Sequence, residues 1–330
     1  MAASETVQLF LNEPWLFYNA QPSDEAVNVG LPLALKHAEE YPIGPGISLD
    51  YFDDSTPEGV VRVDIVVPAS GQNLFHYRHA EPKHPNDPRV VYYVHGGGFV
   101  RGNGKYCRGM GLWALRHTGL PVYTVEYSMA PERKWPANLD DLEAAWNHLT
   151  EDLGFAPEDI ITIGDSAGGT LTAALAMRLK RLGKPLPGAM AFLSPALDFT
   201  LTLPSHAANA DADPLFPGGL PRESVDIWAS REAVLDPEMS PFRGDWSGFP
   251  PLYFCAGESE VLLSDSLESA HKAHRHGVDV RCHVFNGLWH DWVTDHPEMP
   301  ESHAVGAHLR EFIGLPPIPA EEPEPSEERN

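Results

Sequence analysis

A serine flanked by glycines has the residue type and the spacing of a hydrolytic nucleophile. Ser166 lies in Gly164-Asp-Ser-Ala-Gly168, directly after the isoleucine-rich stretch 160–163. A nucleophilic serine of this kind stands in a strained turn from a strand to a helix, where side chains two positions before and after it would collide with the backbone. Glycine at both positions removes the collision. The pattern therefore predicts Ser166 as the nucleophile of an acyl-transfer reaction.

A run of glycines earlier in the chain predicts donors for an oxyanion. His95-Gly-Gly-Gly-Phe99 directly follows a stretch with the pattern of a buried strand. Consecutive glycines let backbone N–H groups point into a site without a Cβ in the way, and the amide of Ala167, after the nucleophile, would act with them. A glycine run alone is also typical of a flexible turn. Its combination with the serine motif favours the oxyanion loop.

The base and its orienting acid are expected after the serine, with the acid before the histidine. His290 comes just past the last predicted strand, which favours it over the other histidines. Three carboxylates, Glu258, Glu260 and Asp265, follow the preceding strand. Glu260 is favoured because the loop must turn back towards His290 before the next helix begins. Asp265 is then expected in the first turn of that helix, where it interacts favourably with the helix dipole.

Strand and helix patterns alternate along most of the chain. Strands are expected at 47–52, 60–67, 89–95, 120–126, 159–164, 189–194, 251–256 and 278–285, and helices at 106–117, 138–153, 167–182, 263–276 and 302–313. This alternation predicts an α/β fold whose mainly parallel central sheet, of about eight strands, is flanked by helices on both faces. The catalytic loops should lie at the carboxyl ends of the strands.

Two segments interrupt the alternation. Residues 1–47 are amphipathic and precede the strands, so they are predicted to form the N-terminal part of a helical cap, with an ordinary packing helix as the alternative. The long insertion at 199–235, with a helix expected at its end, is predicted to be the second cap segment. The hydrolytic core then comprises 48–198 and 236–314, followed by a disordered acidic tail rich in proline and glutamate at 315–330.

The composition restricts the partners and the compartment. The net charge of -24 would repel nucleic acid and anionic membrane surfaces, so neither is expected as a partner. The three cysteines, Cys107, Cys255 and Cys282, form no CxxC pair, and no HExxH motif or Cys/His cluster is present, so we expect no metal and no cofactor. The N-terminus lacks the pattern of a secretory signal, and no apolar stretch is long enough to span a membrane. A cytoplasmic location is expected.

The chain resembles the hormone-sensitive-lipase group of α/β-hydrolase carboxylesterases from about residue 86 to residue 313. The resemblance rests on the serine and glycine motifs above and on Glu126-Tyr-Ser-Met-Ala-Pro-Glu132, Trp135-Pro136, Ser194-Pro-Ala-Leu-Asp198 and Asp236-Pro-Glu-Met-Ser-Pro241. It implies an α/β-hydrolase fold with a helical cap over the acyl pocket. It also implies that the amides of Gly97, Gly98 and Ala167 form the oxyanion hole and that the acid is Glu260, three residues after the strand-ending glycine.

Two residues depart from the family pattern. Glu260 is followed by Val-Leu where the family most often has an Asp-Pro-Leu triplet, but a carboxylate one methylene longer can still orient the imidazole. Arg101 stands where apolar residues are common in the family. It is a candidate to bind a polar or acidic substrate group at the pocket mouth, with a surface salt bridge as the alternative. Phe99, Trp15 and Trp289 are the other candidates for the substrate pocket.

These residues predict a serine carboxylesterase with a Ser166, His290 and Glu260 triad, a small-molecule ester as substrate and an acyl-enzyme intermediate. The resemblance implies short- to medium-chain acyl groups. A lactonase or an amidase or deacetylase on the same triad is the main alternative. A non-catalytic binding protein similar to the plant hormone receptors is less favoured, because such receptors lack the base. A homodimer paired through the last strand and helix is left open, since the family includes monomers and dimers.

Overall fold

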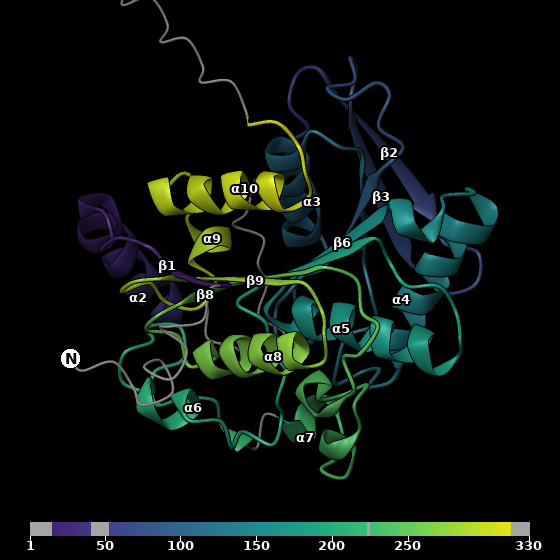
Figure 1. The fold of residues 1–330 in the computed structure, drawn as a ribbon. Coiled ribbons are helices and arrows are strands. Elements are labelled where there is room, and N and C mark those ends of the chain that lie inside the picture. The colour runs from purple at the N-terminus through teal and green to yellow at the C-terminus, as the bar shows by residue number, and fades with distance from the viewer. Residues whose placement is uncertain (1–14, 41–52, 223–224, 318–330) are drawn as a thin grey trace, which may run out of the picture.

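A twisted sheet of nine strands runs through the centre of the molecule (Figure 1). The computed structural model describes residues 15–40, 53–222 and 225–317. The strand order is β1-β9-β8-β7-β6-β4-β5-β3-β2. β3 is antiparallel to both β2 and β5, and the other neighbours are parallel. The strands are β1 (Leu16–Tyr18), β2 (Val60–Val66), β3 (Asn73–His79), β4 (Val90–Val94), β5 (Val122–Val125), β6 (Ile160–Asp165), β7 (Ala189–Leu193), β8 (Leu252–Gly257) and β9 (Val280–Phe285).

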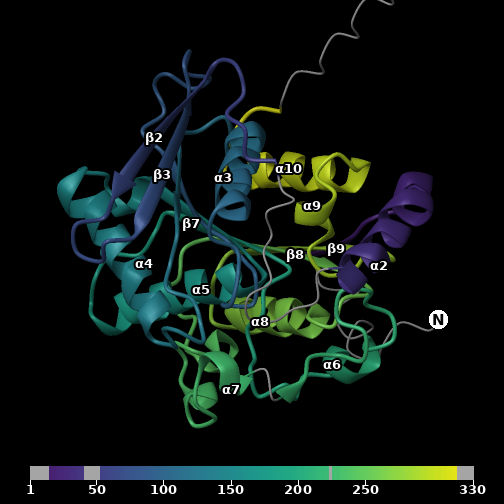
Figure 2. The ribbon, with the colours of Figure 1, turned by 180° about the vertical axis from the view of Figure 1, so that it is seen from behind.

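Helices cover both faces of the sheet, as Figures 1 and 2 show from opposite sides. α3 (Lys105–Thr118) and α10 (Pro300–Phe312) lie on one face, and α4 (Ala137–Asn147), α5 (Ser166–Arg181) and α8 (Leu263–Arg275) lie on the other. The central strands are wholly buried between the two layers, which explains their continuous apolar sequences. The predicted α/β class and the mainly parallel sheet are confirmed. Four of the predicted helices begin and end within two residues of these bounds, whereas the helix predicted at 138–153 ends as α4 at Asn147 and is followed by a π-helical turn at 148–152.

Several short elements connect these layers. They are η1 (Ala26–Gly30), α2 (Leu31–Glu40), η2 (His148–Asp152), η3 (Pro157–Asp159), α6 (Ser205–Ala208), α7 (Val225–Trp228), η5 (Ala233–Leu235), η6 (Pro241–Arg243) and α9 (Trp292–Asp295). In the described ranges of the chain, no helix combines the length and the apolar character needed to cross a bilayer.

The N-terminal segment is not wholly helical, which corrects the prediction for this part of 1–47. Leu16, Phe17 and Tyr18 form β1, which pairs in parallel with Cys282, His283 and Val284 of β9. Three residues are too short for a strand period to be visible in the sequence. β1 pairs with three of the six residues of β9, on the outer edge of that strand. Residues 1–14 and the strand predicted at 47–52 lie outside the described residues.

The sequence also does not predict β3, because polar residues interrupt the alternation of apolar and polar side chains that marks a strand. Its sequence contains asparagine, arginine and two histidines, yet Leu74, Phe75 and Tyr77 are buried. It is antiparallel to β5 and β2, and so joins the parallel part of the sheet to the antiparallel edge. Pairing on both sides therefore stabilises this strand, which its amino-acid composition does not favour.

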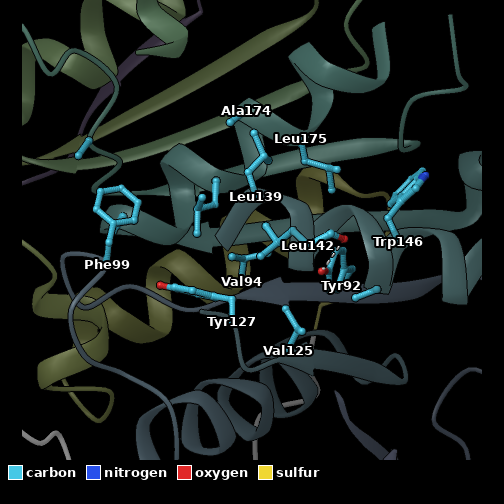
Figure 3. Close-up of a cluster of buried hydrophobic side chains, with 14 of the residues drawn as sticks. Tyr92, Val94, Phe99, Val125, Tyr127, Leu139, Leu142, Trp146, Ala174 and Leu175 are labelled. Carbon is cyan, nitrogen blue, oxygen red and sulfur yellow. Dashed lines mark hydrogen bonds between the residues drawn. The ribbon is translucent and has the colours of Figure 1, made fainter. Parts of the chain in front are cut away.

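A buried cluster fixes the two elements that carry the catalytic loops (Figure 3). Val94 at the end of β4 packs with Leu139 and Leu142 of α4 and with Leu175 of α5. All four side chains are almost completely inaccessible to solvent. Phe99 belongs to the same cluster, on the loop that follows β4. Packing of β4 against α5 therefore holds the glycine loop and the serine turn in a fixed relation.

In the part of the insertion 199–235 that the structure describes, the helices are short, and the helix expected from 224 to 233 ends as α7 at Trp228. At the end of this helix, the backbone carbonyl of Trp228 accepts a hydrogen bond of 2.8 Å from the backbone amide of Trp135. The insertion is held to α8 by His206, whose Nε2 lies 2.6 Å from Asp265 Oδ2. Asp265 is in the first turn of α8, as predicted, but it bonds to other elements.

Candidate active site

Ser166 stands at the junction between β6 and α5, in the turn that its sequence predicted. Its φ angle is 48°, in the left-handed region that strains a residue with a side chain. A Cβ at Gly164 would lie 2.5 Å from the carbonyl oxygen of Gly168, and a Cβ at Gly168 would lie 2.0 Å from that of Val94. Only glycine fits at either position, so the two glycines are required by the close approach of β6, α5 and β4.

The glycine loop after β4 adopts backbone angles that suit glycine. Gly97 has a φ angle of 102° and Gly98 one of 62°. A Cβ on Gly97 would lie 2.3 Å from the carbonyl oxygen of Arg101, so the loop could not close with a larger residue there. Gly97, Gly98 and Ala167 all line the same cavity as Ser166. The three residues predicted to supply the oxyanion donors therefore border the cavity that contains the predicted nucleophile.

A buried carboxylate ties the glycine loop to the serine turn. Asp165 accepts hydrogen bonds from the amide of Gly96 at 2.9 Å, from Tyr93 at 2.8 Å and from Tyr106 at 2.5 Å. Burial and the nearby charge of Asp291 raise the pKa of Asp165 to about 7, and the three donors oppose this rise. Sequence reasoning gave Asp165 no role. Asp165 directly precedes Ser166, and through the amide of Gly96 its side chain holds the glycine loop to the serine turn.

The structure brings the predicted nucleophile, base and acid together. His290 Nε2 lies 2.9 Å from Ser166 Oγ, and both side chains are buried. On the other side of the ring, Glu260 Oε2 lies 3.8 Å from His290 Nδ1. This second distance is longer than a hydrogen bond, and such contacts in a free enzyme are often long and shorten when substrate binds. The Ser166–His290 contact therefore has the length of a hydrogen bond, and Glu260 is the carboxylate nearest to Nδ1 of the ring among the three considered from the sequence.

The other two carboxylates considered from sequence lie elsewhere. Glu258 is partly exposed and accepts a hydrogen bond of 3.0 Å from the amide of Gly287. Asp265 bonds to His206 and to backbone amides at the start of the insertion. Of the three, Glu260 is the one at the His290 ring, and it is completely buried.

Two further carboxylates near the base were not found from the sequence. Asp291 has a φ angle of 54°, and its Oδ2 lies 3.1 Å from His290 Nε2, on the side that faces Ser166. Asp213, in the insertion, is buried and accepts a hydrogen bond of 2.9 Å from the amide of Val261. Asp291 adjoins His290 in the chain and could have been considered for that reason. Asp213 lies in an irregular segment, where no pattern predicts which way a side chain points.

Two carboxylates, Asp291 and Glu260, favour the charged form of the His290 imidazole. Burial of the imidazole disfavours its charged form, but Asp291 and Glu260 outweigh burial and raise the pKa of His290 well above its ordinary value. Burial raises the pKa of Glu260 to about 7, and the nearby charge of His290 opposes this rise. The site therefore favours a positively charged imidazole, which is the form that His290 takes after removing the serine proton.

Replacing Asp291 by asparagine is expected to move the acid limb of the kcat/KM profile for a p-nitrophenyl ester to lower pH. Asp291 raises the pKa of His290, and the imidazole must be neutral to act as a base, so its removal lets the base form at lower pH. Rates measured across the range in which histidine titrates would show the shift. The exposed Asp152, paired with His148, supplies the control Asp152→Asn, which should leave the limb in place. If the acid limb of Asp291→Asn stayed at the same pH or moved to higher pH, this role of Asp291 would be contradicted.

The cavity beside Ser166 has an apolar wall and a polar wall. The apolar wall comes largely from the insertion and contains Phe99, Phe199, Phe216, Ile227 and Trp228. The Phe99 and Trp228 rings have centroids 4.5 Å apart, and those of Phe199 and Trp228 are 4.6 Å apart. The polar wall contains His37, Arg101, Asp291, Thr294 and Asp295.

Of the four side chains predicted for the pocket, Phe99 and Arg101 line the cavity, and the two tryptophans do not. Trp15 packs at the sheet edge, with its ring centroid 5.3 Å from that of His274 on α8. Trp289 is buried beside η1, where a Cβ on Gly30 would lie 2.7 Å from its ring. Trp289 adjoins His290 in the chain, but it packs into the core. The pocket role predicted for Trp15 and Trp289 is therefore wrong.

Comparison with known proteins settles the family. A family model described as the α/β-hydrolase fold matches residues 91–294. The chain belongs to this family. An esterase of Acinetobacter venetianus is 30% identical over 225 residues, which cover 68% of this chain and 74% of the relative. The putative acetyl-hydrolase LipR of Mycobacterium tuberculosis is 30% identical over 236 residues, covering 70% of this chain and 75% of the relative.

Solved esterase structures have the same fold. The structure of EstE5 soaked with p-nitrophenyl butyrate superimposes with a TM-score of 0.75 at 26% identity, covering 89% of this chain and 100% of that one. An esterase from the bacterial hormone-sensitive lipase family gives a TM-score of 0.71 at 28% identity, covering 86% of this chain and 89% of the other. The predicted family, the α/β-hydrolase fold and the enzyme class, carboxylic ester hydrolase, are confirmed.

Proposed function

We propose that this α/β-hydrolase is a serine carboxylesterase that cleaves short- to medium-chain esters through a triad of Ser166, His290 and Glu260. One observation carries the proposal: His290 Nε2 lies 2.9 Å from Ser166 Oγ, beside a cavity into which the glycine loop also faces. A nucleophile, its base and oxyanion donors on one cavity are the parts that acyl transfer needs. The esterases among the relatives support the same reaction class.

The reaction proceeds in two steps on this geometry. Ser166 Oγ attacks the ester carbonyl carbon while His290 Nε2 takes the serine proton, and the backbone N–H groups of Gly97, Gly98 and Ala167 stabilise the negative oxygen. The C–O bond to the alcohol breaks, and His290 returns the proton to the leaving alcohol. Water then attacks the acyl-enzyme with His290 as base, which releases the carboxylic acid. Glu260 orients the imidazole and stabilises its positive charge.

The apolar wall supports a short or medium acyl group. Phe99, Phe199 and Trp228 are buried and pack against one another at the side of the cavity, where an alkyl chain would lose contact with water. We propose the described parts of 1–47 and 199–235 as the cap, because His37 of the first and Trp228 of the second line the cavity. The core division into 48–198 and 236–314, the tail at 315–330, the absence of a cofactor and the cytoplasmic location stay predictions.

A panel of p-nitrophenyl esters with purified protein tests the proposal. We expect the highest kcat/KM between acetate and octanoate, a strong fall for palmitate, and no change on adding a chelator. Including p-nitroacetanilide and an aliphatic lactone separates the alternatives, because an amidase or a lactonase on the same triad would prefer one of these. Folded protein that hydrolyses none of the esters would contradict the proposal and would favour a binding protein.

A further inference from the structure

The polar wall of the cavity follows directly from the catalytic histidine. Asp291 is the next residue after His290, and Thr294 and Asp295 lie on the short helix α9 that begins one residue later. All three line the same cavity as Ser166, and Arg101 lines it from the glycine loop. This wall therefore differs in chemistry from the wall formed by Phe99, Phe199 and Trp228.

The reaction identifies which half of an ester this wall would contact. In the proposed mechanism His290 Nε2 returns its proton to the oxygen of the leaving alcohol, so that oxygen must lie beside this nitrogen. Asp291 Oδ2 is 3.1 Å from the same nitrogen. The wall that begins at Asp291 therefore lies on the leaving-group side. Phe216 also borders the imidazole, with ring centroids 4.9 Å apart, so the part of the apolar wall left for the acyl chain is the cluster of Phe99, Phe199 and Trp228.

Two carboxyl oxygens on this wall lack partners. Among the described parts of the chain, neither Asp291 Oδ1 nor Asp295 Oδ2 has a hydrogen-bond partner, and both atoms are shielded from solvent. Asp291 is only 8% exposed. Buried polar atoms in native proteins are almost always hydrogen-bonded, so such atoms beside a catalytic cavity indicate contacts that the substrate completes. An alkyl alcohol has nothing to offer them.

The charges around Asp291 and Asp295 favour a hydroxyl group over a cation as the partner of their unbonded carboxyl oxygens. Burial and the charge of Asp291 raise the pKa of Asp295 to about 8, against the opposing charges of His290 and Arg101. This rise favours the protonated form of Asp295, which can both donate and accept a hydrogen bond. A cationic alcohol would lie beside Arg101 and beside the imidazolium that forms during catalysis, which repel it. A hydroxyl group meets donors and acceptors without that repulsion.

We propose that the leaving-group side of this site, formed by Asp291, Thr294, Asp295 and Arg101, selects esters of hydroxylated alcohols such as glycerol or sugars over alkyl esters of the same acid. The inference rests on the proposed esterase function and names the alcohol half of its substrate. It assigns the apolar wall to the acyl half.

Two esters with one acyl group test the inference. The wild-type kcat/KM for glyceryl monobutyrate should exceed that for propyl butyrate by about tenfold or more. Asp295→Leu should bring this ratio close to one, and Asp295→Asn, which keeps hydrogen-bonding atoms, should retain much of it. Ile227→Val on the apolar wall is the matched control, and it should leave the ratio unchanged because both esters carry the same acyl chain.

Equal wild-type rates for the two esters, or a ratio that survives in Asp295→Leu, would overturn the inference. A higher kcat/KM for choline butyrate than for glyceryl monobutyrate would also overturn it, in favour of a cation site. Calorimetric binding of the same esters to Ser166→Ala protein needs no turnover and separates this failure from failure of the esterase function. Tighter binding of the glyceryl ester supports the inference even if no ester is hydrolysed, and equal Kd values contradict it.

Discussion

Replacing Ser166 by alanine is expected to lower kcat for p-nitrophenyl butyrate by about 10⁴- to 10⁶-fold. Ser166 Oγ is the atom 2.9 Å from His290 Nε2, and without it no acyl-enzyme forms. The amides of Gly97, Gly98 and Ala167 remain and would account for residual turnover. Initial rates corrected for spontaneous hydrolysis give the measurement. Ser230→Ala, at an exposed serine in the insertion, is the control and should keep wild-type activity.

The variant should fold as the wild type does, because alanine and serine differ by one oxygen atom at this position. An unchanged circular dichroism spectrum and thermal midpoint would establish this. If Ser166→Ala retained a tenth or more of the wild-type kcat, a different residue would have to be the nucleophile, and the proposed mechanism would be wrong.

Replacing Glu260 by glutamine is expected to lower kcat by about 10⁴-fold. The glutamine has a similar shape but no charge, so it no longer stabilises the His290 imidazolium and can hold the ring in the wrong tautomer. Glu260→Asp, which shortens the side chain by one methylene, should recover part of the activity. Steady-state kinetics of the three proteins on one ester give the comparison.

Glu258 is the matched control, because it lies in the same loop and bonds to the amide of Gly287. Glu258→Gln should leave kcat nearly unchanged. Asp213 is the competing buried carboxylate, and Asp213→Asn should reduce kcat far less than Glu260→Gln. A larger loss in Asp213→Asn, with activity retained in Glu260→Gln, would transfer the role of the acid to the insertion.

The serine turn could be predicted because its constraints are local. Gly164 and Gly168 are needed wherever a strand turns into a helix around a nucleophile, and their contacts with the neighbouring backbone show why no larger residue fits. The position of His290 after the last strand follows from the order of parallel strands and helices. Glu260 was a choice among three neighbours, which could be narrowed by its distance from the strand end but not decided by periodicity.

The rest of the site depends on side-chain directions in irregular segments. Trp289 and Asp291 are both next to His290 in sequence, yet one packs into the core and the other contacts the imidazole. No repeating pattern separates them, because the backbone at Asp291 is left-handed rather than helical or extended. Asp213 lies in an irregular part of the insertion and accepts a hydrogen bond from the amide of Val261, in the loop that carries Glu260. β1 shows the same limit, since its three residues are defined by pairing with β9.

The most direct test of the central claim is to find which atom becomes acylated or sulfonylated. The protein is treated with phenylmethanesulfonyl fluoride, and the adduct is located by intact-mass and peptide mass spectrometry alongside the loss of esterase activity. We predict one adduct, on Ser166, that forms in step with inactivation, is absent from Ser166→Ala and forms much more slowly in His290→Ala. Inactivation with the label on another residue, or a fully labelled Ser166 in protein that keeps its activity, would contradict the account.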